Sequence, residues 1–198
     1  MKILTILFII TFTTCFGQTY KFDKLVKSEI TTKNFLDRED TYLFNTKDYS
    51  YSMKIFSEND SLKSWIIDTK RNQVHYFNID KKDSLNYLKT ETFKSQLPKY
   101  EYTFTDIKIE RGNKKIALTI LNEEKRKIAK YKMTIRETDE NFFPFFQLTG
   151  AVEPFHLMNI EVPLNFIVLK SKGLNISRNQ LIYKLKSTEN INVLIAIP

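Results

Sequence analysis

The side chains that could support nucleophilic catalysis are few in this sequence. Its only histidines are His75 and His156. A hydrolase of the serine type needs a nucleophile, an orienting acid and a base, and that base is usually histidine. His75 stands in an alternating apolar segment with Phe77, His156 follows a Pro-Phe pair, and no Gly-x-Ser-x-Gly or Ser-x-x-Lys motif accompanies either. We therefore expect a packed or surface role for both histidines, no catalytic residue, and a protein that is not an enzyme.

The acidic residues offer neither a calcium motif nor a defined glycosidase pair. They gather in three places, Glu58 with Asp60, Asp80 with Asp83, and Glu137 with Asp139 and Glu140. None has the Asp-x-Asp-x-Asn-Gly spacing or the distal Glu of a calcium loop. The third cluster could supply the two carboxylates of a glycosidase, but a solvated turn explains it more simply. We predict no metal site and no cofactor.

Phosphate and nucleic-acid recognition are also disfavoured. Gly112, Gly150 and Gly173 are isolated, so no glycine-rich phosphate loop is present. The net charge is +8, but the densest basic run, residues 125–127, directly follows Glu123 and Glu124. We expect no nucleic-acid partner and interpret the lysines as outward strand residues that maintain solubility and protect sheet edges. Weak contact with an anionic envelope surface is a second interpretation.

The first 18 residues predict export. Lys2 precedes an apolar run from Ile3 to Phe12, which is too short to span a bilayer, and Cys15 and Gly17 are small residues spaced for signal peptidase. We predict a cleaved signal peptide over residues 1–17, one β-rich domain over 18–198, and a periplasmic or extracellular location. The alternative is a lipoprotein anchored at Cys15, although the residues before it fit a lipobox poorly. Cleavage after Gly17 removes the only cysteine, so stability must come from packing.

Period-two alternation of apolar and polar residues dominates the rest of the chain and predicts strands. Strand candidates cover 40–45, 49–55, 62–68, 73–79, 100–105, 116–120, 129–136, 160–169, 181–186 and 191–197, whereas 19–30 and 85–93 fit either strand or helix. Glu110–Lys115 is expected to be a turn. Connections this short join antiparallel neighbours. We predict a mainly β fold of about eight to ten strands, an antiparallel meander forming a curved sheet, half-barrel or sandwich, with one or two short helices.

An aromatic segment, Asn141–Phe155, breaks the alternation and is expected to be an irregular crossing or a short helix. It contributes five phenylalanines, Phe142, Phe143, Phe145, Phe146 and Phe155. Core packing accounts for so much apolar surface most simply. The alternative is that the segment lies across the concave face of an incompletely closed sheet and lines a pocket for an acyl chain or another apolar ligand.

The combination of signal peptide, long meander and hydrophobic crossing resembles, in architecture, the half-barrel lipid and lipoprotein carriers of bacterial envelopes. Export together with the lack of a catalytic constellation first predicts a non-enzymatic binding or interaction module of the envelope, with an unknown envelope protein as partner. The narrower alternative is a carrier of a lipid or other apolar ligand. A hydrolase is the third and least supported hypothesis.

Overall fold

The structure is a computed structural model that describes residues 17–32, 35–80, 84–94, 100–149, 160–175 and 179–198. Its elements are β1 (Thr19–Thr32), β2 (Phe35–Phe44), β3 (Tyr51–Glu58), β4 (Ser61–Asp68), β5 (Gln73–Ile79), β6 (Leu85–Thr92), β7 (Glu101–Phe104), β8 (Lys108–Glu110), β9 (Asn113–Leu121), β10 (Lys127–Glu137), α1 (Phe143–Thr149), β11 (Phe166–Leu174) and β12 (Gln180–Ala196).

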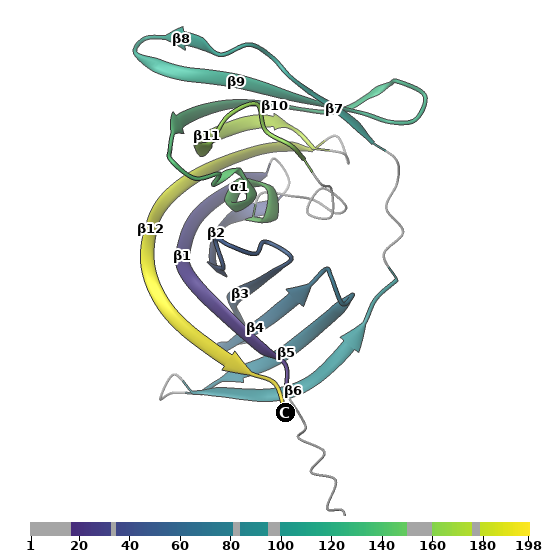
Figure 1. The fold of residues 1–198 in the computed structure, drawn as a ribbon, viewed down its shortest axis with the longest axis vertical. Helices are drawn as coiled ribbons and strands as arrows, with labels where there is room; N and C mark the ends of the chain where they lie inside the picture. The colour runs from purple at the N-terminus through teal and green to yellow at the C-terminus, as the bar shows by residue number, and fades with distance from the viewer. Residues whose placement is uncertain (1–16, 33–34, 81–83, 95–99, 150–159, 176–178) are drawn as a thin grey trace, which may run out of the picture.

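The strands form one 12-stranded antiparallel sheet in the order β6-β5-β4-β3-β2-β1-β12-β11-β10-β9-β7, with β8 paired to β9. In the described part of the chain the outermost strands, β6 and β7, do not pair with each other, so the sheet is open. It curls around the single described helix, α1, because β1 and β12 are long and strongly bent (Figure 1). The predicted fold class, a mainly β curved meander with a short helix, is confirmed.

The central seam of the sheet joins the first strand to the last. The register runs from Thr19 opposite Ala196 to Thr32 opposite Leu181. We predicted two strands where β12 is one continuous strand of 17 residues. The polar segment 187–190 looks like a turn in the sequence, but each of its residues pairs with β1.

A register shift between Phe22 and Lys24 bends the seam, as bulges do. Beyond it, the ends of β1 and β12 cover one face of β3 to β5 and enclose a separate apolar core. The buried members of this core are Tyr20, Phe22, Leu43, Met53, Ile66, Phe77, Ile195 and Ile197. The lower part of the molecule is therefore built from two layers of the same sheet.

The upper part follows the predicted alternation closely. In β9 and β10 alternate residues are buried, Ile116, Leu118 and Ile120 in one strand and Ala129, Tyr131, Met133 and Ile135 in the other. They form one core with the α1 residues Phe143 and Phe146. The predicted meander of three strands is thus confirmed in β7, β9 and β10, which are neighbours in the sheet.

Three local expectations were wrong. The turn expected over Glu110–Lys115 is confined to Arg111 and Gly112, both at positive φ (52° and 76°), as a two-residue type I′ hairpin requires. This tight turn lets β8 and the start of β9 pair, and the sheet has 12 strands instead of the predicted eight to ten. The strand expected from residue 160 begins only at Phe166, after Pro163, which has no N–H to donate to a ladder.

No helix in the described part of the chain is long and apolar enough to cross a membrane.

Candidate functional site

The aromatic segment places α1 on the concave face of the sheet. The Asn141 side-chain oxygen accepts a hydrogen bond from the Phe143 N–H (3.0 Å), which caps the helix N-terminus. Pro144 follows within the first turn, where its missing N–H costs nothing. A short helix is therefore formed where the sequence left helix and irregular crossing open.

The phenylalanines of α1 pack directly onto the sheet. Phe143, Phe145 and Phe146 are at most 1% exposed. Phe145 stacks on Phe44 of β2 with ring centroids 4.9 Å apart, and Phe146 meets Tyr183 of β12 edge-on at 5.1 Å. Phe142 is half-buried and stacks on Phe145 at 5.1 Å.

Four of the five predicted lining residues are thus brought together on one face, and Phe155 lies outside the described residues. Core packing accounts for the three buried rings. That any of the five borders a ligand stays a prediction.

Below α1, on the same face of the sheet, lies a pocket of about 300 Å³, which we call the concave pocket. Leu148 and Thr149 of α1 form its upper wall. The remaining lining residues come from β2 to β4 and their connections, namely Arg38, Tyr42, Tyr49, Ser50, Tyr51, Ser52, Lys54, Trp65, Ile67 and Thr69. The lining is therefore rich in aromatic rings.

A cross-strand row of aromatic and lysine side chains runs past this pocket. Its members are direct partners on successive strands from β2 to β6, in the order Tyr42, Lys54, Trp65, Tyr76 and Lys89. The Lys54 Nζ lies 5.5 Å from the Tyr42 ring centroid and 5.9 Å from that of Trp65. Such distances allow cation–π attraction.

The charge of the concave pocket is set by one buried carboxylate and two cations. The Asp40 carboxylate, 1% exposed, accepts an ion pair from Lys54 Nζ (2.9 Å) and another from an Arg38 guanidinium nitrogen (2.8 Å). Burial lowers the pKa of Lys54, and the hydrogen bond to Asp40 opposes that effect. Among the described residues that line the pocket, Arg38 and Lys54 are the charged ones. Together with Asp40 they leave one positive charge at its rim, on the half-exposed Arg38.

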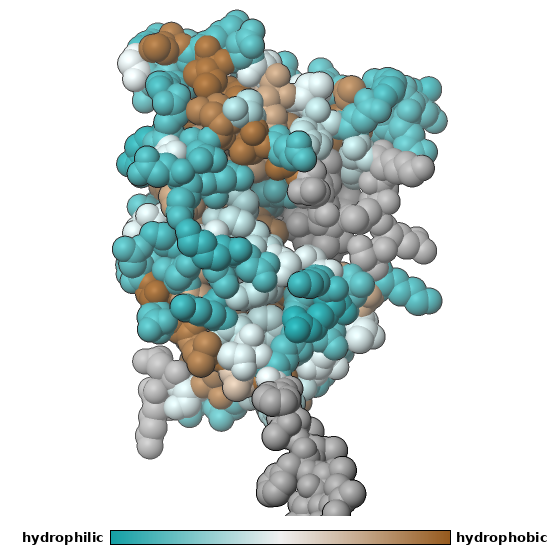
Figure 2. Space-filling view, in the orientation of Figure 1, coloured by the Kyte–Doolittle hydropathy of each residue, from teal (hydrophilic) through white to brown (hydrophobic). Residues whose placement is uncertain are grey.

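A second hollow, the apolar groove, lies on the opposite face of β3 and β4 and has a volume of about 230 Å³. Its lining residues are all apolar, namely Leu43, Met53, Ile55, Leu62, Ile79, Leu85, Val193 and Ile195. Figure 2 shows hydrophobic surface in this lower region of the molecule. The groove lacks a polar group that would orient a ligand.

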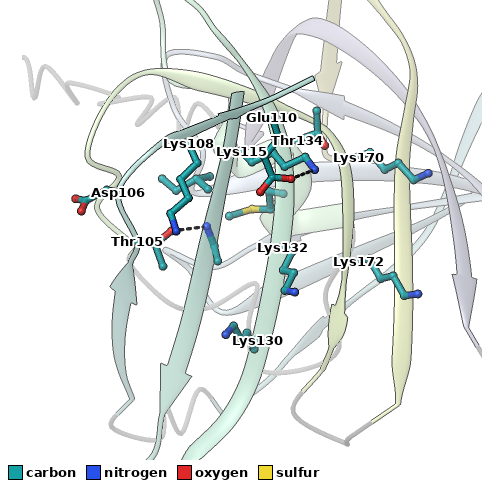
Figure 3. A pocket seen from close by; sticks show the side chains of 13 residues that line it. Thr105, Asp106, Lys108, Glu110, Lys115, Lys130, Lys132, Thr134, Lys170 and Lys172 are labelled. Atoms are coloured by element: carbon teal, nitrogen blue, oxygen red, sulfur yellow. Dashed lines mark hydrogen bonds and ion pairs between the residues drawn. The ribbon is translucent and has the colours of Figure 1, made fainter. Parts of the chain in front are cut away.

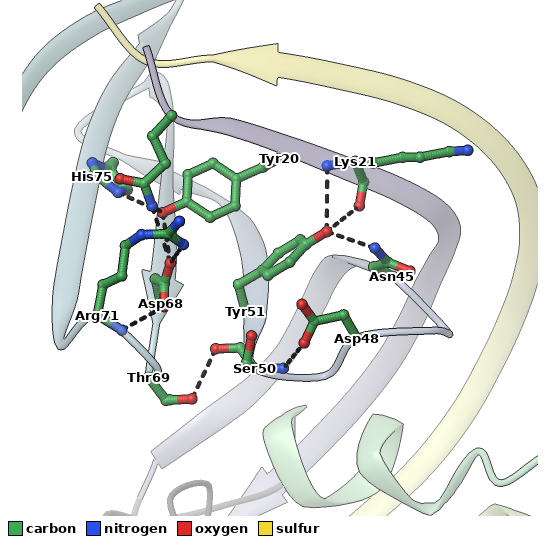
Figure 4. A network of polar contacts seen from close by, with 11 residues as sticks. Tyr20, Lys21, Asn45, Asp48, Ser50, Tyr51, Asp68, Thr69, Arg71 and His75 are labelled. Carbon is green, nitrogen blue, oxygen red and sulfur yellow. Dashed lines mark hydrogen bonds and ion pairs between the residues drawn. The ribbon is translucent and has the colours of Figure 1, made fainter. Parts of the chain in front are cut away.

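His75 belongs to a buried polar network that ties β1 to β4, β5 and β6 (Figure 4). The Tyr20 hydroxyl donates to Asp68 (2.9 Å) and lies 2.8 Å from His75 Nε2, and His75 Nδ1 lies 2.6 Å from the Thr90 hydroxyl. A neutral imidazole that donates from Nε2 and accepts at Nδ1 satisfies both contacts. Asp68 in turn pairs with Arg71 (3.0 Å).

This network is buried and lies apart from the concave pocket. His75 is 1% exposed, burial lowers its pKa, and neither it, Tyr20, Asp68 nor Thr90 lines the concave pocket. The prediction of a packed histidine is confirmed for His75. His156 lies outside the described residues.

The described acidic clusters lie in turns and at strand ends, and three of their glutamates pair with lysines. Glu58 pairs with Lys63 (2.5 Å), Glu137 with Lys114 (2.7 Å), and Glu140 with Lys47. No three His, Cys, Asp or Glu side chains of the described residues lie close enough together to hold a metal ion. Asp83 lies outside the described residues.

The residues of the concave pocket were not singled out from the sequence. Lys54 alternates with Tyr51, Met53 and Ile55, so the period-two pattern indicated an outward polar position. In the structure both faces of β3 are covered, and Lys54 is only 8% exposed. The one available signal was Trp65, the single tryptophan, on the same face as Lys54 once the strands are in register.

No protein-family model matches the sequence, and no curated protein matches it. Among solved structures, the chain is similar to a LolA superfamily protein from Nitrosomonas europaea, with 6% identity, 87% of each chain covered and a TM-score of 0.33. It is also similar to a domain described as an outer membrane lipoprotein-sorting protein from Vibrio parahaemolyticus (8% identity, 85% of each chain, TM-score 0.23). A third is a DUF1329 family protein from Desulfovibrio piger (7% identity, 88% of this chain and 86% of the other, TM-score 0.26). We draw no functional argument from similarities at this level.

Proposed function

We propose that this protein is an exported, non-enzymatic binding protein of a bacterial envelope, with residues 1–17 removed as a signal peptide and residues 18–198 forming one domain. We further propose that it carries an apolar ligand with an anionic group, such as a fatty acid or an acylated phosphate, in the concave pocket.

The observation that carries this proposal is the pairing of aromatic walls with a single net positive charge in one pocket. Trp65, Tyr42 and Leu148 offer apolar contact, and Arg38 offers an exposed guanidinium at the rim. Ligand pockets combine an apolar lining with a few polar groups that fix orientation. A volume of about 300 Å³ is at the lower end for such sites and suits a short acyl segment near its headgroup.

The shape of the pocket is tested by filling it. In Leu148→Trp the larger side chain should occupy the space under α1 and weaken binding of a fluorescent fatty acid to lipid-free protein by at least about tenfold, roughly 1.4 kcal/mol. Leu194→Trp is the matched control, because Leu194 is 70% exposed on β12. A ligand held instead in the apolar groove would respond to Leu62→Trp and not to Leu148→Trp, and this result would refute the assignment.

The charge is tested separately by comparing a fatty acid with its methyl ester. Arg38→Gln removes the rim charge while Asp40 and Lys54 remain paired, so affinity for the acid should fall several-fold and affinity for the ester should not change. Arg136→Gln, an exposed arginine at the end of β10, is the control. Equal losses for acid and ester would contradict recognition of the anionic group.

Native mass spectrometry of the protein purified from its source separates the carrier from the broader alternative. A carrier should arrive with a bound lipid mass that survives gentle desolvation. An adaptor of the envelope should arrive with a protein partner and without lipid.

A further inference from the structure

The outer face of β10 and β11 carries exposed lysines that the ligand site does not use. Lys130 and Lys132 alternate with the buried Tyr131, and Lys170 and Lys172 occupy the same face of β11. We call these four residues the lysine face. Figure 3 shows Lys170 and Lys172 projecting from β11 on the same side. Because Tyr131 packs in the core beneath α1, the lysine face and the concave pocket lie on opposite faces of the sheet.

Like charges face each other directly across these strands. Lys132 is the cross-strand partner of Lys172, and Lys170 is the partner of Lys184 on β12. Directly opposed like charges destabilise a sheet. The folded protein therefore bears a repulsion here that an external anion would relieve.

Ion pairs neutralise many exposed lysines elsewhere in the described chain, but not these. Lys63 and Lys89 each lie 2.5 Å from a glutamate oxygen, and Lys115, at the border of the face, pairs with Glu110. Among the described residues no carboxylate lies within ion-pair distance of any of the four lysines. Asp106 and Glu110 also line the first depression, and Glu110 interacts electrostatically with Lys132. The lysines outnumber these two carboxylates, so the net field of the face is positive.

The surface between the lysines is broad and shallow. It consists of two adjoining depressions of about 570 and 690 Å³, both lined by Lys130, Lys132 and Lys172. Among the described residues, no arginine lines either depression, whereas a site for one particular carboxylate or phosphate usually uses the planar guanidinium fork. Leu174, the partner of Lys130, is 51% exposed within the second depression.

We propose that the lysine face docks the protein reversibly on an anionic phospholipid surface. Clustered lysines without a defined pocket suit a two-dimensional array of phosphates, and an exposed leucine among them can enter the headgroup region. In this orientation the concave pocket faces away from the lipid. The inference is independent of the proposed ligand, because it concerns the other face of the sheet.

The test is co-sedimentation of the full mature chain with vesicles of phosphatidylcholine containing about one-third phosphatidylglycerol. Attraction to an anionic surface is roughly additive over lysines and screened by salt. Lys132→Glu/Lys172→Glu should therefore lower partitioning by at least about tenfold at low salt. The matched control, Lys70→Glu/Lys94→Glu, makes the same change in net charge at exposed residues near β4 to β6, at the other end of the sheet, and should bind like the wild type.

Each outcome decides the proposal. The proposal is supported if the wild type and the control variant bind the vesicles, and if binding is lost in Lys132→Glu/Lys172→Glu and at high salt. Unchanged binding of the reversed pair, equal losses in both double variants, or failure of the wild type to bind anionic vesicles would overturn it. Binding of the wild type to soluble polyglutamate but not to vesicles would also overturn the proposal, and it would assign the lysine face to an acidic protein. Lys132→Gln/Lys172→Gln repeats the test without introducing acidic residues.

Discussion

His75 lies in a buried hydrogen-bond network in which the donor or acceptor role of each side chain depends on the protonation state of its neighbour. The Tyr20 hydroxyl already donates to Asp68, so His75 Nε2 must donate to the Tyr20 oxygen, whereas Nδ1 can accept from or donate to the Thr90 hydroxyl. Burial lowers the pKa of His75 and the charge of Arg71 acts in the same direction, while Asp68 opposes both. The folded protein therefore binds a proton at His75 less readily than the unfolded chain does.

This difference makes stability depend on pH. Above about pH 6.5 both states hold a neutral imidazole, and as the pH falls below that value only the unfolded state is protonated, so the free energy of unfolding should decrease, by about 1 kcal/mol between pH 7.5 and 5.5. Urea unfolding at the two pH values measures it. The Asp68 carboxyl contributes nothing in this window, because its pKa is lowered from an already acidic value.

The variant His75→Gln should remove this pH dependence, and His156→Gln, which changes the other histidine, should leave it intact. A wild-type protein whose unfolding free energy is the same at both pH values would contradict a neutral, buried His75. So would a His75→Gln variant that keeps the full dependence.

Among the elements, α1 connects cores that lie on separate parts of the sheet. Phe143 and Phe146 belong to the upper core, and Phe145 packs with Val26 and Phe44 of β1 and β2. A helix of seven residues is too short to be stable by itself. Its position therefore depends on these rings, which in turn cover the sheet.

Truncation of one ring tests this dependence. Phe146 is fully buried against Tyr131 and Tyr183, so Phe146→Ala should lower the free energy of unfolding by about 3–5 kcal/mol. Phe142→Ala is the control, because truncation of the half-buried Phe142 should lower the free energy of unfolding by only roughly 1–2 kcal/mol. Equal losses measured by chemical unfolding would show that α1 does not anchor the upper core.

Sequence patterns predicted the elements wherever burial alternates along a strand, as at Ile116, Leu118 and Ile120. They failed where burial depends on a distant partner. Lys54 lies buried where the register places it between Tyr42 and Trp65, on the face that carries the concave pocket. This register is not encoded in the residues next to Lys54, so the concave pocket was not predictable locally. The helix that borders it was one of the two alternatives, helix or irregular crossing, that the sequence left open.

In the whole molecule, the first and last strands meet at the centre of the sheet and the outermost strands are interior to the sequence. The Ile197 N–H donates to the Gln18 carbonyl (2.7 Å), so the start of β1 and the end of β12 lie side by side. Joining them would bring β12 and β1 into one hairpin. Every neighbouring pair of strands from β10 through β12 and β1 to β6 would then be consecutive in the chain.

A circular permutant tests this arrangement. In this permutant a short Gly-Ser linker joins Pro198 to Gln18, and the new termini lie between Glu123 and Glu124. The change opens an exposed turn and keeps the seam between β1 and β12. Such turns tolerate new termini. Because opening this turn removes the closure of only a short hairpin, we expect cooperative unfolding with a free energy of unfolding that is lower by about 1 kcal/mol. Circular dichroism and urea unfolding of residues 18–198 and of the permutant measure this difference.

The control uses the same linker but opens the chain between Thr188 and Glu189. The sequence pattern indicates a turn between two strands at this point, whereas the structure has the middle of β12 there. That permutant should lose cooperative folding, because cutting β12 detaches the layer that covers β3 to β5. If it is instead the more stable of the two, β12 behaves as two strands and does not act as one continuous strand in the seam.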